Sequence, residues 1–171
     1  MDQLSFDSFT KKIYIKAPIE KLYWSWATTA GICSWFLRKA DYTTKNGELR
    51  NPDDFVAIGD VYTWEWHNWD GQEKGTVLEA NGQSTISFSF ADVCKVTVNL
   101  RDMGKAVLVT LVQSDIPVDE ESKINIYTGC SNGWTFWLAN LKAYLEHGIQ
   151  LNETEFDLRK EPLAGHIFVN M

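Results

Sequence analysis

Few side chains in this sequence are spaced for acid–base chemistry. The three histidines are His67, His147 and His166. Only His67 has an acidic residue two positions away, and residues two apart in a β-strand point to the same face, so Glu65 and His67 would lie side by side. If that face lined a cavity, the two side chains could exchange protons as acid and base. We favour the plainer interpretation, in which Glu65 and His67 lie on a solvent-exposed outer face, and the pattern leaves both faces open.

Other patterns of catalytic, metal or nucleotide sites are absent from the sequence. It contains no GxSxG, HExxH, DxDxDG, GxGxxG or GxxxxGK segment. The cysteines Cys33, Cys94 and Cys130 are too widely separated to form a CxxC pair. We therefore expect no catalytic residues, no metal and no cofactor.

Aromatic residues are the unusual feature of the composition, with 8 tryptophans in 171 residues. They have two interpretations, a plain hydrophobic core or an apolar pocket in which indole N–H groups serve as polar anchors. We favour a pocket for the set as a whole, because bulky aromatics from both helix and strands converge. The predicted ligand-binding residues are Trp35, Trp64, Trp66, Phe88, Phe90, Trp134, Trp137 and Leu141.

Charge and hydropathy narrow the classes of partner. The formal net charge is −7 and no basic block is present, so nucleic acid and anionic membranes are poor partners. The N-terminal residues lack an apolar signal core, and no run of 18 apolar residues occurs. We expect a single domain over residues 1–171 in the reducing cytoplasm, with a small hydrophobic ligand as partner and a chaperone as a second candidate.

One long helix, expected over residues 122–147, organises the chain. Its apolar residues recur every three or four positions, which places them on one helical face. Acidic residues precede it and Gly148 can supply a left-handed C-terminal residue. Gly129 and Gly133 lie four residues apart, so we expect another backbone to approach closely there.

The preceding chain reads as a strand, two short helices and then a run of strands. The helical segments are 18–28 and 30–37, with Thr28 or Thr29 as the cap of the second. The expected strands are 9–16, 40–44, 61–67, 74–80, 84–90, 95–101 and 106–114. Turn signals such as Asn81-Gly82 link the later strands into an antiparallel meander. The prediction is an α+β fold in which a curved sheet grips the long helix and leaves room for a cavity.

The tail after the long helix, residues 149–171, shows no periodicity. We expect it to lie along the surface with Phe168 and Val169 docked on the body of the domain.

Particular residues within about 9–148 resemble a known family. They are Pro18–Trp26 with Trp35-Phe36, Gly59-Asp60, the strand Gly75–Glu79, and Gly133-Trp134 followed by Leu138, Leu141 and Tyr144–Glu146. This set resembles the START-like superfamily, also called the helix-grip or SRPBCC fold, and within it the AHSA-like homologues of the activator of the ninety-kilodalton heat-shock chaperone ATPase. The resemblance implies a curved antiparallel sheet of about seven strands around the long C-terminal helix.

The resemblance also implies several classes of function. The superfamily includes lipid carriers, hormone receptors, polyketide cyclases and aromatases, chaperone activators and many uncharacterised bacterial proteins. We rank first a cytoplasmic binding protein that holds a small hydrophobic or aromatic ligand between sheet and helix. A chaperone ATPase modulator is the second hypothesis, and a cyclase or aromatase that uses Glu65 and His67 is the third.

Overall fold

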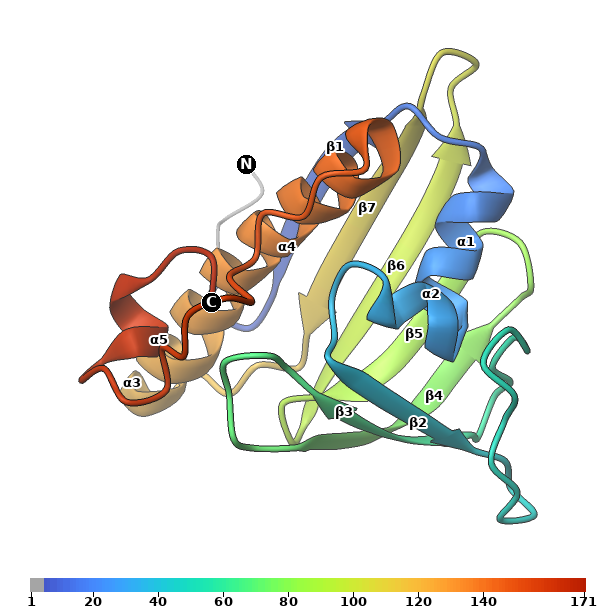
Figure 1. Ribbon diagram of the computed structural model, residues 1–171. Coiled ribbons are helices and arrows are strands. Elements are labelled where there is room, and N and C mark those ends of the chain that lie inside the picture. Colours follow the sequence, from blue (N-terminus) through green and yellow to red (C-terminus); the bar gives the residue numbers. More distant parts are fainter. Residues whose placement is uncertain (1–4) are drawn as a thin grey trace.

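A seven-stranded sheet curves around the helices in the computed structural model, which describes residues 5–171 (Figure 1). All neighbouring strands are antiparallel, in the order β1-β7-β6-β5-β4-β3-β2. The strands are β1 Phe9–Ile15, β2 Lys39–Thr43, β3 Val61–Glu65, β4 Glu73–Ala80, β5 Thr85–Phe90, β6 Cys94–Asp102 and β7 Val107–Ser114. The predicted meander and the α+β class are confirmed.

The first strand forms one edge of the sheet, where it pairs with the last strand, β7. Phe9 lies opposite Gln113, and Ile15 lies opposite Val107. Side chains alternate across β7, so Val109, Leu111 and Gln113 all face the inside of the sheet and are fully buried. The side chains of β7 on the inner face are therefore apolar except at its end, where Gln113 is the last inward residue.

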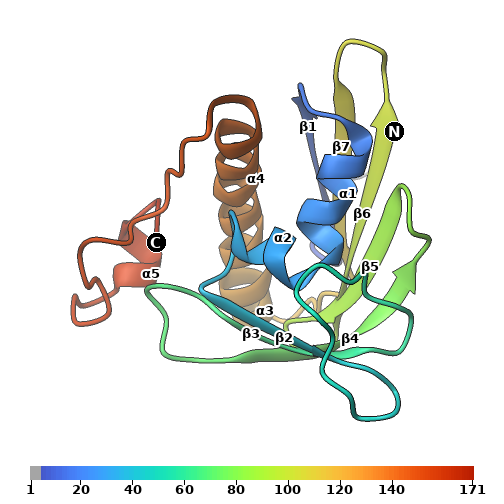
Figure 2. The ribbon, with the colours of Figure 1, turned by 45° about the vertical axis from the view of Figure 1, so that its right-hand side comes forward.

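Two short helices lie in the concave side of the sheet, beside the long helix (Figure 2). They are α1 Ile19–Ala27 and α2 Thr29–Cys33. Pro18 precedes α1, and Thr28 caps α2 by accepting the Gly31 N–H at 2.9 Å. The chain between α2 and β2 carries Trp35-Phe36 into the space between sheet and long helix.

The C-terminal helix runs without a break from Glu120 to His147 in three parts. These are α3 Glu120–Ser122, the π-helical segment η1 Lys123–Thr128 and α4 Gly129–His147. Asp119 caps the start through the Ser122 N–H at 3.0 Å, and Gly148 ends the helix with φ of 68°. The predicted helix is confirmed, but the sequence pattern did not indicate the wider turns of η1.

The expected close approach of a backbone at the helix glycines is wrong. A Cβ atom added to Gly129 or Gly133 would meet no atom within 4 Å. Gly129 is exposed and Gly133 partly exposed, so the face that they share borders open space.

The tail returns along the outside of α4 and ends near the short helix α5, Ala164–Ile167 (Figure 1). Asn68 holds the tail by donating to the Glu153 carbonyl at 2.9 Å and accepting the Leu158 N–H at 3.0 Å. The expected docking of the last apolar residues is wrong, because Phe168 is 37% and Val169 82% exposed. Leu158 and Ala164 are the buried tail residues instead.

Candidate functional site

Aromatic rings fill the space between the sheet and α4. Phe36 lies at the centre and is only 3% exposed. Its ring centroid lies 5.1 to 5.8 Å from five tryptophan rings, those of Trp35, Trp64, Trp66, Trp134 and Trp137. With Phe88 and Phe90, which contact Trp64 at 5.1 and 6.4 Å, these residues form what we call the aromatic cluster.

The structure brings the eight predicted ligand-binding residues into one region. Six are buried: Trp35, Trp64, Phe88, Trp134, Trp137 and Leu141. Trp66 and Phe90 are partly buried at the margin of the cluster. Phe36 was not among the predicted residues although it contacts most of them, and its position beside Trp35 in an apolar run is the signal that could have identified it.

Four buried polar atoms of this core have no hydrogen-bond partner among residues 5–171. They are Trp26 Nε1, Tyr42 Oη, Trp64 Nε1 and Gln113 Nε2. By contrast, Trp35 Nε1 donates to the Ser25 carbonyl at 3.0 Å and Trp134 Nε1 to Gln113 Oε1 at 2.9 Å. A buried donor without a partner costs about 1–3 kcal/mol, so the core carries unused hydrogen-bonding capacity.

The fold also gathers polar side chains on the inner face at one end of the sheet. Glu73 lies opposite the buried Trp64, and Cys94 lies opposite Phe90, so both face inward with Gln113. Cys130, from the first turn of α4, completes this group, which we call the polar end. Burial raises the pKa of Glu73, although the Ala91 N–H bound at 2.8 Å opposes the shift.

The cysteines of the polar end are protonated at neutral pH. Burial raises the pKa of Cys94, and it raises that of Cys130 to about 11. Hydrogen bonding by the Gln113 amide lowers the pKa of both thiols and so offsets part of this rise, whereas the charge of the Glu73 carboxylate raises both pKa values further. Burial therefore disfavours a negative charge at the polar end.

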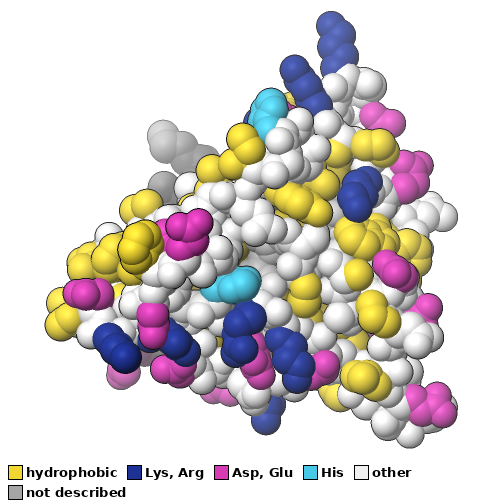
Figure 3. Space-filling model, viewed as in Figure 1, with side chains coloured by type: hydrophobic (Ala, Val, Ile, Leu, Met, Phe, Trp, Pro, Cys, Tyr) yellow, Lys and Arg dark blue, Asp and Glu magenta, His cyan; other side chains and the backbone are white. Residues whose placement is uncertain are grey.

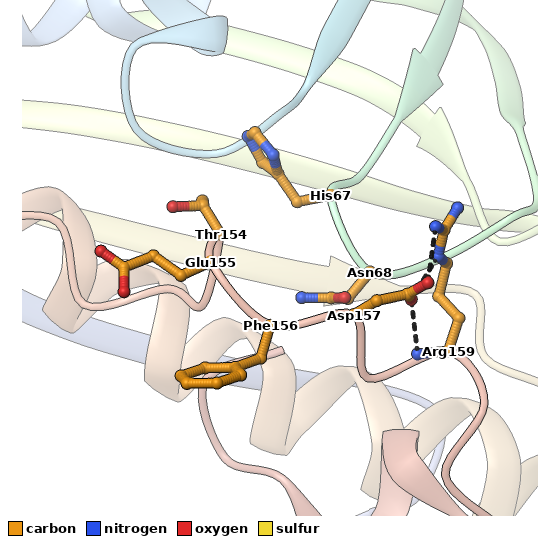
Figure 4. Close-up of a pocket in the computed structure, with 7 residues that line it drawn as sticks. All are labelled: His67, Asn68, Thr154, Glu155, Phe156, Asp157 and Arg159. Carbon is orange, nitrogen blue, oxygen red and sulfur yellow. Dashed lines mark hydrogen bonds and ion pairs between the residues drawn. The ribbon is translucent and has the colours of Figure 1, made fainter.

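Two hollows on the surface lie away from the aromatic cluster. One, of about 160 Å³, lies between the β3–β4 loop and the tail, as Figure 4 shows. Its lining residues are His67, Asn68, Thr154, Glu155, Phe156, Asp157 and Arg159. The other, of about 410 Å³, lies between the β1–α1 loop and the β6–β7 hairpin.

Glu65 and His67 lie outside the aromatic cluster. Glu65 pairs with Arg38 at 2.6 Å and accepts from Gln72 at 2.8 Å on the outer face of β3. The His67 side chain is exposed at the rim of the first hollow (Figure 4), and partial burial followed by the charge of Arg38 lowers its pKa. The hypothesis that this pair acts inside a cavity therefore loses its geometric basis.

Two further properties concern the described part of the chain. Within residues 5–171, no three His, Cys, Asp or Glu side chains are grouped to hold a metal ion. None of the helices in the same range is long and apolar enough to span a membrane.

Solved structures with the same fold come from several bacteria. A Staphylococcus saprophyticus protein superposes with a TM-score of 0.66 at 17% identity, over 84% of this chain and 94% of that one. The Aha1 dimer of Colwellia psychrerythraea gives 0.64 at 17% identity, over 82% and 97%. DynU16, from the dynemicin biosynthetic locus, gives 0.66 at 17% identity, over 88% of this chain and 50% of that one.

No curated protein matches the sequence significantly. A family model described as "Activator of Hsp90 ATPase homolog 1-like protein" matches residues 16–146, which include the two short helices, β2–β7 and almost all of α4. The helix-grip architecture of the sheet and α4 is that of the AHSA-like neighbours. The chain belongs to the family of Activator of Hsp90 ATPase homolog 1-like proteins, a branch of the START-like superfamily.

Proposed function

We propose that this protein binds a small hydrophobic or aromatic ligand between the sheet and α4. The ligand would contact the aromatic cluster and Leu141, the residues predicted from the sequence. The observation that carries the proposal is a set of buried N–H donors that have no partner in the described part of the chain and lie in an otherwise apolar region. They are Trp26 Nε1, Trp64 Nε1 and Gln113 Nε2. Apolar surroundings with a few convergent polar groups are typical of small-molecule sites.

Entry of a ligand requires part of the cover to move, because side chains occupy the gap. The segment η1 lies next to the polar end, because it precedes Cys130 and its Tyr127 contacts Phe9, the β1 residue opposite Gln113. It has no buried residue, whereas α4 has five. Segments with little buried apolar surface open at a lower free energy than the rest of a domain. Opening at η1 would expose the polar end and the Trp134 edge of the cluster.

Calorimetric titration of the full chain with a panel of small lipids, steroids and aromatic polyketides tests the proposal. We expect saturable micromolar binding that weakens about tenfold in Trp137→Phe, which replaces an indole of the cluster wall by a smaller phenyl ring. Trp24→Phe is the matched control, because Trp24 lies on the outer side of α1 and its indole donates to Asp53 at 3.3 Å. Absence of heat with every compound, or equal weakening in both variants, would contradict ligand binding in the core.

A chaperone ATPase modulator is the second candidate. The family description supports it, and so does the apolar surface over the tail on the left of Figure 3. Its exposed members include Phe156, Leu163, Ile167 and Val169, which are between 62% and 82% exposed. A purified chaperone whose ATPase rate is unchanged by excess of this protein would rule the role out.

A cyclase or aromatase is the third candidate. DynU16, a protein of similar fold, comes from a biosynthetic locus, but the likeness at 17% identity concerns the fold alone. With Glu65 and His67 on the outside, such an enzyme would have to use Glu73, the carboxylate on the inner face of β4. Conversion of a polyketide substrate that persists in Glu73→Gln would exclude Glu73 from that role.

A further inference from the structure

The amide of Gln113 has a fixed orientation inside the core. An indole N–H can only donate, so the Gln113 atom that faces Trp134 Nε1 at 2.9 Å must be the carbonyl oxygen. The amide nitrogen consequently points the other way. It is completely buried and has no partner among the described residues. One strong donor on the inner face is therefore held in place without a strong acceptor.

The groups around this nitrogen satisfy it only weakly. The thiols of Cys94 and Cys130 lie near the amide, since it influences the pKa of both. Hydrogen bonding by the Gln113 amide lowers the pKa of both thiols, but neutral sulfur is a weak acceptor, so the amide nitrogen lacks a strong partner. The neighbouring carboxylate of Glu73 is already bonded to the Ala91 N–H at 2.8 Å through Oε1.

The polar end extends from the interior to the surface. Gln113 and Cys94 are buried, whereas Cys130, Glu73 and Phe90 are partly exposed. The half-exposed ring of Phe90 lies 5.6 Å from Trp134, so aromatic surface adjoins the free donor. A ligand that entered beneath η1 would meet Gln113 first and the aromatic cluster next.

We infer that Gln113 Nε2 is the recognition donor of the site, and that it selects an uncharged aromatic compound bearing a carbonyl oxygen. This inference rests on the proposed binding function and adds the chemical class of the ligand. A carbonyl oxygen supplies the acceptor that the donor lacks, and an aromatic ring continues the stacking of Phe90 and Trp134. A carboxylate is selected against, because it would be desolvated beside the Glu73 carboxylate.

Two neutral probes of the same shape distinguish the contribution of the hydrogen bond to affinity from that of burying an aromatic ring. Acetophenone has a carbonyl group where α-methylstyrene has a C=CH₂ group, and benzoate adds the negative charge. With the full chain, we expect acetophenone to bind about 3- to 10-fold more tightly than α-methylstyrene in calorimetric titration, and benzoate not to bind. Gln113→Leu should bind the two neutral probes equally, and the control Gln83→Leu, in an exposed turn, should keep the preference.

A second measurement does not depend on the stability of the variant. In the unsubstituted protein labelled with ¹⁵N, acetophenone should shift the side-chain amide resonances of Gln113, and α-methylstyrene should leave them in place. Equal affinity for the two neutral probes, or an unmoved Gln113 amide in the acetophenone complex, overturns the role of Gln113 while ligand binding stands. Failure of both probes to bind up to their solubility limits overturns the inference together with the proposed function.

Discussion

Replacing Asn140 by leucine is expected to lower the free energy of unfolding by about 2–3 kcal/mol. Asn140 is completely buried on α4, and its amide joins three parts of the chain. Its Nδ2 donates to the Trp35 carbonyl at 2.5 Å, and its Oδ1 accepts the Leu151 N–H at 2.6 Å. Leucine has a similar volume, so the loss comes from these two backbone groups and not from a cavity.

The size of this loss in stability depends on whether each backbone group that loses its hydrogen bond is buried or exposed. The Trp35 carbonyl is buried and would bear the full cost of about 1–3 kcal/mol for an unsatisfied polar atom. Leu151 is exposed, so water can replace the lost bond at its N–H and the cost there is smaller. The sum is about 2–3 kcal/mol, with the greater share at Trp35.

Urea unfolding followed by circular dichroism measures the loss, and near-ultraviolet circular dichroism reports whether the aromatic cluster keeps its packing. Asn132→Leu is the matched control, because Asn132 is exposed on the same helix and forms no side-chain hydrogen bond in the described structure. Faster hydrogen exchange at the Leu151 amide should accompany the loss in Asn140→Leu. A loss below about 0.5 kcal/mol, or an equal loss in the control, would refute the assignment of Asn140 as the tie between α4, Trp35 and the tail.

Three further predictions concern other elements. Gly133→Ala should raise the free energy of unfolding by about 0.5–1 kcal/mol in urea titration, because the added methyl group meets open space on a helix interior position. Thr28→Ala should lower it by about 1 kcal/mol through loss of the α2 cap. The free energy of unfolding of Glu73→Gln, relative to that of the natural chain, should increase as the pH rises from about 4 to 7. Urea titrations at several pH values measure this difference. The folded state raises the pKa of Glu73, so its carboxyl favours folding while protonated and loses that contribution as it ionises.

Each of these has an internal control. Gly148→Ala should destabilise the protein, since Gly148 has φ of 68° and a side chain is strained there, so equal effects at both glycines would contradict the helix argument. Thr28→Ser keeps the hydroxyl and should retain most of the stability, and a loss as large as in the alanine variant would point to the methyl group instead. A stability difference for Glu73→Gln that is constant across pH would contradict the raised pKa.

Most of the architecture followed from side-chain periodicity. Strand alternation and turn residues such as Asn81-Gly82 predicted the meander, and Gly148 marked the end of the long helix. The wider turns of η1 were not predictable, because α and π turns expose nearly the same pattern of apolar residues over six positions. The Thr128 hydroxyl, which donates to the Lys123 carbonyl at 2.9 Å, is a local feature of that segment visible only in the structure.

The candidate site was predictable in part. Aromatic residues on inward positions indicated which rings would meet, and the structure places them together. Gln113 was missed although it lies in the predicted strand 106–114 and the alternation of Val109 and Leu111 places it inside, because the predicted site residues were all apolar or aromatic. The docking of the tail depends on Asn68, some ninety residues distant from Leu158 in sequence, and no local pattern encodes such a contact.

The pairing of β1 with β7 sets an order of events during protein synthesis. Phe9 leaves the ribosome roughly a hundred residues before its partner Gln113, so the first strand must wait while the meander β2–β6 assembles. A waiting strand is a template for pairing with another nascent chain. Lys11 and Lys12 in this strand, and Lys16 just after it, supply the charge that discourages such pairing, so they act in the interval before β1 pairs with β7.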